Sequence, residues 1–324
     1  MNVLVTGATG FVGGRLVEHL LERGDHVTAL VRSPKRATSL VQRGVRCVAG
    51  DLAATSALRD AVTGQDVVYH VAGMLGASTE AELMAANRDG TRNIAQACAM
   101  VAPAPRLVVV SSMAAGGPAR HGAPKIDDGD DHPVTMYGRS KLAAEKVLPP
   151  IAIPWTVLRP PAVYGPGDRY GMLTLFQAVR WGVAPTFGDG SMELSLIHVD
   201  DLAEAIIAAG HADDVLGGVF YVNHPEITTG ANLMRTIARQ MKRAVIPLAI
   251  PRWGARIALT LVGAWADLVR QPTILHVDKL HEFFQEAWTA DPSAFMRTTG
   301  WQPAWDVEHG IADTVAWYRA EKWI

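Results

Sequence analysis

A tyrosine and a lysine four positions apart, Tyr137 and Lys141, are the residues of this sequence best suited to acid–base chemistry. Positions i and i+4 of a helix lie on one face, so a helix over residues 137–148 would hold the phenol beside the amine. An ammonium group next to a phenol favours the phenolate and lowers the phenol pKa from about 10. Such a phenol can exchange a proton with an alcohol or carbonyl oxygen near neutral pH, unless the pair is simply a solvated helix face.

A pair of serines, Ser111 and Ser112, follows an apolar strand predicted over residues 107–110. Parallel α/β sheets bind ligands at the carboxyl ends of their strands, so a hydroxyl here could bond the same substrate oxygen as Tyr137. A serine pair at a strand end can also be only a backbone cap. The two serines and the Tyr–Lys pair together indicate a catalytic site.

A glycine-rich turn, TGATGFVG at residues 6–13, lies between the first predicted strand and the first predicted helix. Gly7 would allow the tight turn, Gly10 the close approach of a pyrophosphate, and Gly13 the packing of helix on strand. The phosphates would then meet the positive end of the helix. The residues expected to contact a dinucleotide here are Thr6, Gly7, Thr9, Gly10, Phe11 and Val12.

The ends of the next strands bear on which dinucleotide binds. Arg32 stands where an acidic residue would accept bonds from a ribose 2′-hydroxyl, and a guanidinium suits a 2′-phosphate instead. We therefore favour NADP(H), with NAD(H) possible and a solvated basic loop as the structural alternative. Further expected cofactor contacts are Asp51 and Leu52 near the adenine and the small-residue stretch Val71, Ala72 and Gly73.

Short apolar segments alternate with helical patterns through the first half of the chain. We expect strands over residues 3–5, 26–31, 45–49, 67–71, 107–110 and 155–158, and helices over 11–23, 80–101 and 137–148. This alternation predicts an α/β fold with a Rossmann-type doubly wound parallel sheet. Gly- and Pro-rich breaks after Arg159 indicate a smaller, discontinuous C-terminal substrate domain. We place the NAD(P)-binding domain at 1–165, joined by a strand near 218–223, and the substrate domain mostly at 166–324.

The composition excludes several classes of function. A net charge of -2 without blocks of like charge argues against nucleic acid as a partner. Cys47 and Cys98 have no metal-ligand spacing, which predicts no metal site and a reducing, cytoplasmic location. The longest apolar tract, residues 257–266, is too short for a membrane span, which needs about 20 residues.

Motifs along nearly the whole chain resemble the extended short-chain dehydrogenases/reductases, also called the NAD-dependent epimerase/dehydratase family. They are TGATGFVG at 6–13, NRDGTRN at 87–93, VSSMAAGG at 110–117, YGRSK at 137–141, RPPAVYGPGD at 159–168, IHVDDLA at 197–203 and GWQP at 300–303. Two departures stand out. Gly116 replaces a usual aromatic residue, and residues 113–115 lack the carboxylate that would serve a dehydratase.

The resemblance implies a role for each matching residue. Ser112, Tyr137 and Lys141 would be catalytic, with Tyr137 as general acid/base and Lys141 also on the nicotinamide ribose. Ser111 would be the structural neighbour of Ser112 and a cofactor contact, and Asn87 would support the cofactor or simply pack as a helix amide. Pro160 and Val163 would lie beside the nicotinamide. His198 is left out of the catalytic set because a strand-end histidine is more often structural. A homodimer through residues 87–101 and 137–148 is also implied.

The dihydroflavonol reductase and 3β-hydroxysteroid dehydrogenase-like branch is the part of the family that this chain resembles most. The resemblance rests on VRSP at 31–34 and on an apolar face of a helix predicted over 253–268, which together with residues 247–251 and 276–288 resembles the substrate region of that branch. That face comprises Trp253, Ile257, Leu261, Ala264, Trp265 and Leu268. It could line the site of an apolar ketone, aldehyde or alcohol of steroid-, lipid- or flavonoid-like type, or it could be core packing, a dimer contact or a membrane surface.

Two other functions stay open. A nucleotide-sugar epimerase or reductase would need cations for a diphosphate, and Arg252, Arg256 and Arg270 could supply them. A cofactor-sensing protein without catalysis would usually lose the tyrosine or the lysine, and both are present. We therefore expect an NAD(P)(H)-dependent oxidoreductase that moves a hydride between cofactor and substrate carbon.

Overall fold

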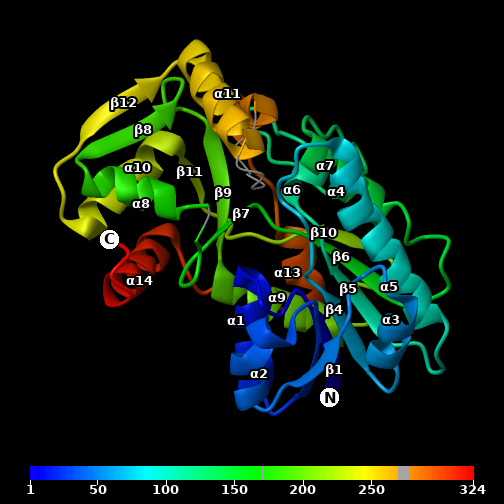
Figure 1. The fold of residues 1–324 in the computed structure, drawn as a ribbon. Coiled ribbons are helices and arrows are strands. Elements are labelled where there is room, and N and C mark those ends of the chain that lie inside the picture. The colour runs from blue at the N-terminus through cyan, green and yellow to red at the C-terminus, as the bar shows by residue number, and fades with distance from the viewer. Residues whose placement is uncertain (170, 269–276) are drawn as a thin grey trace.

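A seven-stranded parallel sheet forms the main body of the protein (Figure 1). The computed structural model describes residues 1–169, 171–268 and 277–324. The strand order is β10-β6-β5-β4-β1-β2-β3. The strands are β1 (Asn2–Thr6), β2 (His26–Val31), β3 (Arg46–Ala49), β4 (Val67–His70), β5 (Arg106–Val110), β6 (Trp155–Arg159) and β10 (Val219–Tyr221). This arrangement confirms the predicted Rossmann-type fold.

Helices cover both faces of the main sheet because successive strand residues point to opposite sides. Val3 and Val5 of β1 pack with α1 (Phe11–Glu22) and α9 (Val199–His211) on one face. Leu4 packs with α3 (Thr55–Val62) and α5 (Gly90–Ala99) on the other. The helix expected over 80–101 is divided into α4 (Glu80–Leu83), a π-helical segment (Met84–Asp89) and α5.

A smaller part of the molecule is built on β9 (Glu193–His198). In this sheet β9 pairs with β11 (Ile227–Thr229), β13 (Ala287–Trp288) and β7 (Ala162–Tyr164). A separate two-stranded sheet is formed by β8 (Val183–Phe187) and β12 (Ile246–Ile250). The helices α8 (Leu173–Arg180), α10 (Gly230–Met241) and α14 (Val307–Ala320) enclose its core around Phe176 and Tyr318. The chain enters this part after β6 and returns to the main sheet at β10.

The remaining helices of the described residues lie on both parts of the molecule. They are α2 (Thr38–Gln42), α6 (Met113–Gly116), α7 (Met136–Glu145), α11 (Arg252–Leu268), α12 (Leu280–Phe283) and α13 (Ser293–Thr299). Phe295 of α13 and the apolar residues of α9 from Leu202 to Ala209 pack into the core of the main sheet, although they follow residue 165. The division into domains at residue 165 stays a prediction. Within the described residues, no helix is both long and apolar enough to cross a membrane.

Candidate active site

The glycine turn is closed so tightly that two of its positions cannot carry a side chain. Gly7 has φ 76°, and a Cβ there would lie 2.8 Å from the backbone nitrogen of Ala72. A Cβ on Gly13 would lie 2.2 Å from the carbonyl oxygen of Gly7. Both approaches are far inside van der Waals contact, so the turn brings the end of β1, the start of α1 and the end of β4 together.

The first turn of α1 offers backbone N–H groups to a ligand. Gly10 is the N-cap residue and has no side chain to accept from them, so the positive end of the helix is uncapped. Thr6, in contrast, is committed to the fold. Its Oγ1 shares a 2.8 Å hydrogen bond with Nδ1 of His70 and accepts one from the Ala72 N–H at 3.2 Å. Thr9 is exposed, and Phe11 and Val12 are half-buried at the start of the helix.

The residues expected around the adenosine lie at neighbouring strand ends. Arg32 follows β2 directly and is exposed. Asp51 Oδ1 accepts a hydrogen bond from the Ala53 N–H at 2.9 Å, the local role of an acid that starts a turn. Leu52 is half-buried, and its carbonyl accepts from Asn93. Val71, Ala72 and Gly73 follow β4.

The catalytic pair lies on α7, as its spacing predicts. Thr135 caps the helix by accepting a 3.2 Å hydrogen bond from the Gly138 N–H. Lys141 is buried and donates from Nζ to the carbonyl oxygen of Val110, 2.9 Å away at the end of β5. A Cβ on Gly73 would lie 3.1 Å from this Nζ. The lysine therefore reaches the same sheet edge as the small-residue stretch.

The expectation that Lys141 lowers the pKa of Tyr137 is wrong for this arrangement. Burial raises the pKa of the Tyr137 phenol above its usual value, and Glu282 raises it further. The Ser112 hydroxyl, which hydrogen-bonds the phenol, lowers that pKa without reversing the shift. Burial also lowers the pKa of the Lys141 ammonium to about 8. Desolvation is the largest cause of both shifts, and it moves the pKa of the phenol up and that of the ammonium down.

The two serines have separate partners. Ser112 lies beside Tyr137, and its Oγ accepts the Ala114 N–H at the start of α6. Ser111 is buried, and its hydroxyl donates to the Glu145 carboxylate. Glu145 in turn pairs with Arg159, which also binds Asp131 at 2.7 Å. Ser111 thus anchors a buried ion-pair network, while Ser112 alone of the pair faces the phenol.

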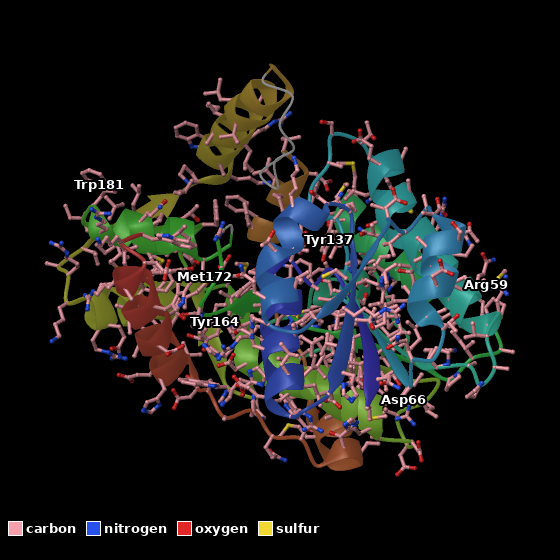
Figure 2. The ribbon with its side chains drawn as sticks, turned by 60° about the horizontal axis from the view of Figure 1, so that its bottom comes forward. Arg59, Asp66, Tyr137, Tyr164, Met172 and Trp181 are labelled. Atoms are coloured by element: carbon pink, nitrogen blue, oxygen red, sulfur yellow. The ribbon has the colours of Figure 1, made fainter. Side chains whose placement is uncertain are left out.

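A segment from the far end of the chain covers the catalytic helix. Asp278 Oδ2 accepts the Met136 N–H at 2.9 Å, and Glu282 Oε1 accepts from the Thr135 hydroxyl at 2.9 Å. The Lys279 ammonium lies 5.6 Å from the centre of the Tyr137 ring. The resemblance placed residues 276–288 in the substrate region, but no local pattern singled out these three residues, because they are separated from Tyr137 by more than a hundred positions. Figure 2 places Tyr137 near the centre of the molecule.

Asn87 holds the loop after β4 against α7. Its Oδ1 accepts the Met74 N–H at 2.8 Å, and its Nδ2 donates to the Met74 carbonyl and to Ser140 Oγ at 2.9 Å. The Ser140 hydroxyl donates to the Tyr137 carbonyl at 2.7 Å. These contacts favour the packing role of Asn87, which positions the catalytic helix relative to residues 71–74.

Pro160, Val163 and His198 lie beyond β6 in the chain, and each has contacts within the fold. The carbonyl of Pro160 accepts the Met113 N–H at 2.8 Å, and Val163 lies in β7 beside Ile197. His198 is fully buried, with its ring 4.6 Å from that of Trp305, and burial lowers its pKa to about 4. A neutral histidine stacked in this way fits a structural role.

Where it is described, the apolar face expected on α11 is exposed and is not packed into a core. Trp253, Ile257 and Leu261 are 71%, 55% and 66% exposed, whereas Ala255 and Leu259 are buried against Leu280 and its neighbours. Helical periodicity shows that a face is apolar, but it does not show which face is covered. In the folded chain the buried face is the one that carries Ala255 and Leu259. The side chains of Ala264, Trp265 and Leu268, and Arg270 as a whole, lie outside the described part of the chain.

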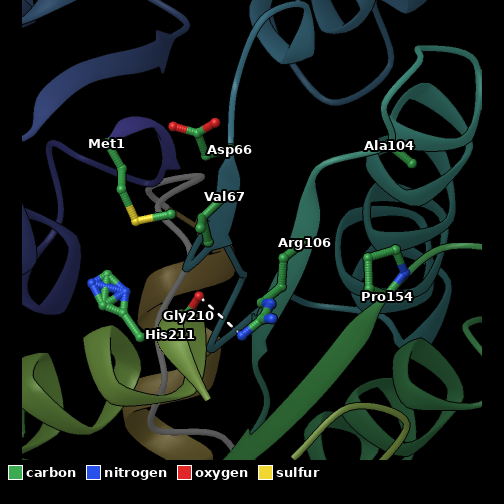
Figure 3. Close-up of a pocket in the computed structure, with 8 residues that line it drawn as sticks. All are labelled: Met1, Asp66, Val67, Ala104, Arg106, Pro154, Gly210 and His211. Atoms are coloured by element: carbon green, nitrogen blue, oxygen red, sulfur yellow. Dashed lines mark hydrogen bonds between the residues drawn. The ribbon is translucent and has the colours of Figure 1, made fainter. Parts of the chain in front are cut away.

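A surface hollow lies at the opposite, amino-terminal edge of the main sheet (Figure 3). Met1, Val67 and Arg106 line it, at the starts of β1, β4 and β5. Arg106 is engaged there with the Gly210 carbonyl at 3.1 Å and the Ala212 carbonyl at 2.8 Å. These bonds tie the end of α9 to the sheet, so the hollow is separate from the catalytic edge.

The carboxyl edge of the sheet fits a dinucleotide. The uncapped α1 terminus and the side-chain-free turn at Gly7 form a cradle for a pyrophosphate. Lys141 and Ser112 lie further along the same edge, beyond the small residues 71–73. A chain of groups from Arg32 through the glycine turn to Tyr137 could therefore hold an elongated cofactor.

Comparisons with known proteins agree with this geometry. A family model described as the NAD dependent epimerase/dehydratase family matches residues 3–222. A ceramide reductase of Caulobacter vibrioides is 33% identical over 324 residues, which cover 99% of this chain and 96% of the relative. A UDP-glucose 4-epimerase of Vibrio cholerae is 27% identical, covering 97% of this chain and 94% of the relative.

Solved structures share the fold. The UDP-glucose 4-epimerase of Thermotoga maritima superimposes with a TM-score of 0.80 at 20% identity, covering 99% of this chain and 100% of that one. Dihydroflavonol reductase-like proteins are also among the sequence relatives. The chain therefore belongs to the NAD-dependent epimerase/dehydratase family, a family of NAD-dependent enzymes of the extended short-chain dehydrogenase/reductase type.

Proposed function

We propose that this enzyme interconverts a ketone or aldehyde and the corresponding alcohol on an apolar substrate. The observation that carries the proposal is the pairing of the half-buried Tyr137 phenol with the Ser112 hydroxyl at the carboxyl edge of the sheet. The names of two relatives support it, the ceramide reductase and a farnesylated dihydroquinoline-oxide ketoreductase of Stigmatella aurantiaca, which is 28% identical over 292 residues.

Aromatic packing beside the catalytic helix supports an apolar substrate. Phe283 lies in α12, directly after Glu282, and stacks on Phe187 with ring centres 4.2 Å apart. Phe284 approaches the same Phe187 ring at 5.8 Å. This cluster adjoins the segment that covers Tyr137, where a diphosphate would need charged partners instead.

Each catalytic residue has a distinct task in the proposed reaction. A bound nicotinamide cofactor supplies the hydride that adds to the carbonyl carbon. The carbonyl oxygen then gains negative charge, and Tyr137 transfers its phenolic proton to it while Ser112 donates a second hydrogen bond. Lys141 would bind the ribose and stabilise the resulting phenolate. In the reverse direction the phenolate accepts the alcohol proton.

The cofactor site is proposed to prefer NADP(H), because Arg32 is exposed at the end of β2 and no acidic residue stands there. The pyrophosphate would lie on the glycine turn at Gly7 and Gly10. A homodimer through residues 87–101 and 137–148, and a cytoplasmic location, stay predictions.

A nucleotide-sugar epimerase is the second candidate. The full-length similarity to the Vibrio cholerae UDP-glucose 4-epimerase favours it. Assays with UDP-sugars and with long-chain ketones, each with both cofactors, discriminate the two. Turnover of UDP-sugars without activity on apolar carbonyls would reject the first proposal.

The test of the chemistry is Tyr137→Phe, which removes only the phenolic oxygen. Single-turnover reduction of an apolar ketone should slow by about 10²–10⁴-fold, the usual range for general acid catalysis. Tyr69→Phe is the matched control. Tyr69 lies in β4, and its buried hydroxyl has no hydrogen-bond partner among the described residues, so its removal should leave the rate unchanged. Near-normal rates in Tyr137→Phe would overturn the mechanism.

A further inference from the structure

The outer face of α11 is apolar, exposed and bordered by cations. Trp253, Ile257 and Leu261 stand at i, i+4 and i+8, so they share one face, and each is more than half exposed. Arg252 and Arg256 precede the first two by one position and are exposed along one side of it. We call these five residues the α11 surface. Figure 1 shows α11 at the outer edge of the smaller part, away from the main sheet.

The chain from 227 to 266 carries only positive charges, and the acids that border it are Glu226 and, near the end of α11, Asp267. Residues 227–266 contain no Asp or Glu and six cations: Arg235, Arg239, Lys242, Arg243, Arg252 and Arg256. Arg239 pairs with Glu308 at 2.9 Å, but Lys242 and Arg243 are exposed and form no ion pair within the described residues. The strand that leads into the helix, β12, also exposes Ile246 and Leu248, 74% and 50%.

We propose that the α11 surface docks on an anionic phospholipid bilayer. A helix with Trp, Ile and Leu on one side and arginines beside them suits the interface between headgroups and acyl chains, where tryptophan is favoured. The excess of cations complements the negative charge of such a membrane. The helix has 17 residues and lies on the protein, so it would rest in the plane of the interface.

A second copy of the chain fits this surface less well. Among the described side chains, Trp253, Ile257 and Leu261 together with Ile246 and Leu248 are few for the roughly 800 Å² that each partner buries in a standard interface. Two copies joined through this face would also bring their arginines together without acidic partners from the same stretch. An anionic lipid surface satisfies both the apolar and the charged residues.

The inner face of α11 links this surface to the active site. Ala255 and Leu259 pack with Leu280, Phe283 and Phe284, in the segment whose Lys279 and Glu282 lie over Tyr137 and Thr135. In a docked enzyme, α11 alone would separate residues 279–284 from the bilayer. The further step, that an apolar substrate enters from the membrane, rests on the proposed function, whereas the docking itself does not.

Vesicle co-sedimentation tests the docking without any substrate. The wild type should bind vesicles of phosphatidylcholine mixed with phosphatidylglycerol more tightly than vesicles of phosphatidylcholine alone. Arg256→Gln should weaken binding to the anionic vesicles about fivefold, because one cation near the surface is lost. Trp253→Ser should weaken binding to both kinds of vesicle, by about tenfold, because apolar burial is lost.

Matched controls carry the same substitutions elsewhere on the surface. Val41→Ser changes a side chain of α2 that is 56% exposed and lies outside the predicted dimer interface, and Arg59→Gln changes an exposed arginine of α3. Arg59 is far from α11 (Figure 2). Both controls should bind like the wild type, and the melting temperatures of these variants should match.

Three results would overturn the proposal: no wild-type binding to anionic vesicles, unchanged binding in Trp253→Ser and Arg256→Gln, or a dimer that Trp253→Ser dissociates. Because vesicle binding is read without turnover, its failure is distinguishable from failure of the proposed reaction. Binding without ketone reduction would retain the docking and reject the apolar carbonyl substrate.

Discussion

Lys141→Met should stabilise the cofactor-free enzyme at neutral pH while it abolishes turnover. The ammonium group is only 7% exposed, and burial lowers its pKa from 10.5 to about 8. A change of this size corresponds to about 3 kcal/mol that disfavours the charged form in the folded state. The methionine side chain keeps most of the apolar stem and removes this penalty.

The gain is reduced by the hydrogen bond that is lost. Lys141 Nζ donates to the Val110 carbonyl at 2.9 Å, and an acceptor left without its partner inside the protein costs about 1–2 kcal/mol. The net increase in the free energy of unfolding at pH 7 is therefore about 1–2 kcal/mol. Turnover should fall because no ammonium remains to bind the ribose or to stabilise the Tyr137 phenolate.

The pH dependence separates this explanation from better packing. The folded pKa of Lys141 lies below the unfolded value of 10.5, so the unfolded chain binds more protons between about pH 8 and 10.5. The free energy of unfolding of the wild type therefore rises with pH through that window. Below the window, the cost of burying the charged ammonium is present in full. The advantage of Lys141→Met should shrink within the window and become a deficit near its upper end.

Urea unfolding of wild type and variant, at pH 7 and at about pH 10, measures this difference. Lys146→Met is the control, because Lys146 is exposed at the end of the same helix and should change stability by less than about 0.5 kcal/mol. A Lys141→Met protein that is less stable at pH 7, or a difference that does not vary with pH, would refute the reasoning.

Three further substitutions test other parts of the site. Arg32→Ala should weaken NADPH binding about ten- to hundredfold and leave NADH binding nearly unchanged, and equal wild-type affinities for the two in a fluorescence titration would contradict the cofactor proposal. Gly13→Ala should prevent cofactor binding and lower the melting temperature, because its Cβ would meet the Gly7 carbonyl at 2.2 Å, whereas Gly14→Ala, with 3.6 Å to the nearest atom, should be tolerated. Glu145→Gln should destabilise the protein by about 3 kcal/mol by leaving buried Arg159 with one carboxylate, and a urea midpoint equal to that of the wild type would exclude this.

Several features could be predicted from the sequence because they depend on neighbours along the chain. The apolar runs predicted the strands of the main sheet, and the glycines between the first strand and helix predicted a turn that admits no side chains at Gly7 and Gly13. The four-residue spacing placed Tyr137 and Lys141 on one helix. Strand periodicity, turn conformation and helical spacing are local properties, and residue type determines them directly.

Tertiary structure alone decided the electrostatics and the coverage of the site. Desolvation and the charge of Glu282 raise the phenol pKa of Tyr137, which the neighbouring ammonium was expected to lower, and Lys279 lies over its ring. The Ser111 hydroxyl donates to the Glu145 carboxylate, whereas Ser112 faces the phenol. On α11 the pattern showed an apolar face, but packing buried Ala255 and Leu259 and exposed Trp253. The physical reason is the same in each case: burial and charge are set by groups distant in sequence, whose positions follow only from the folded chain.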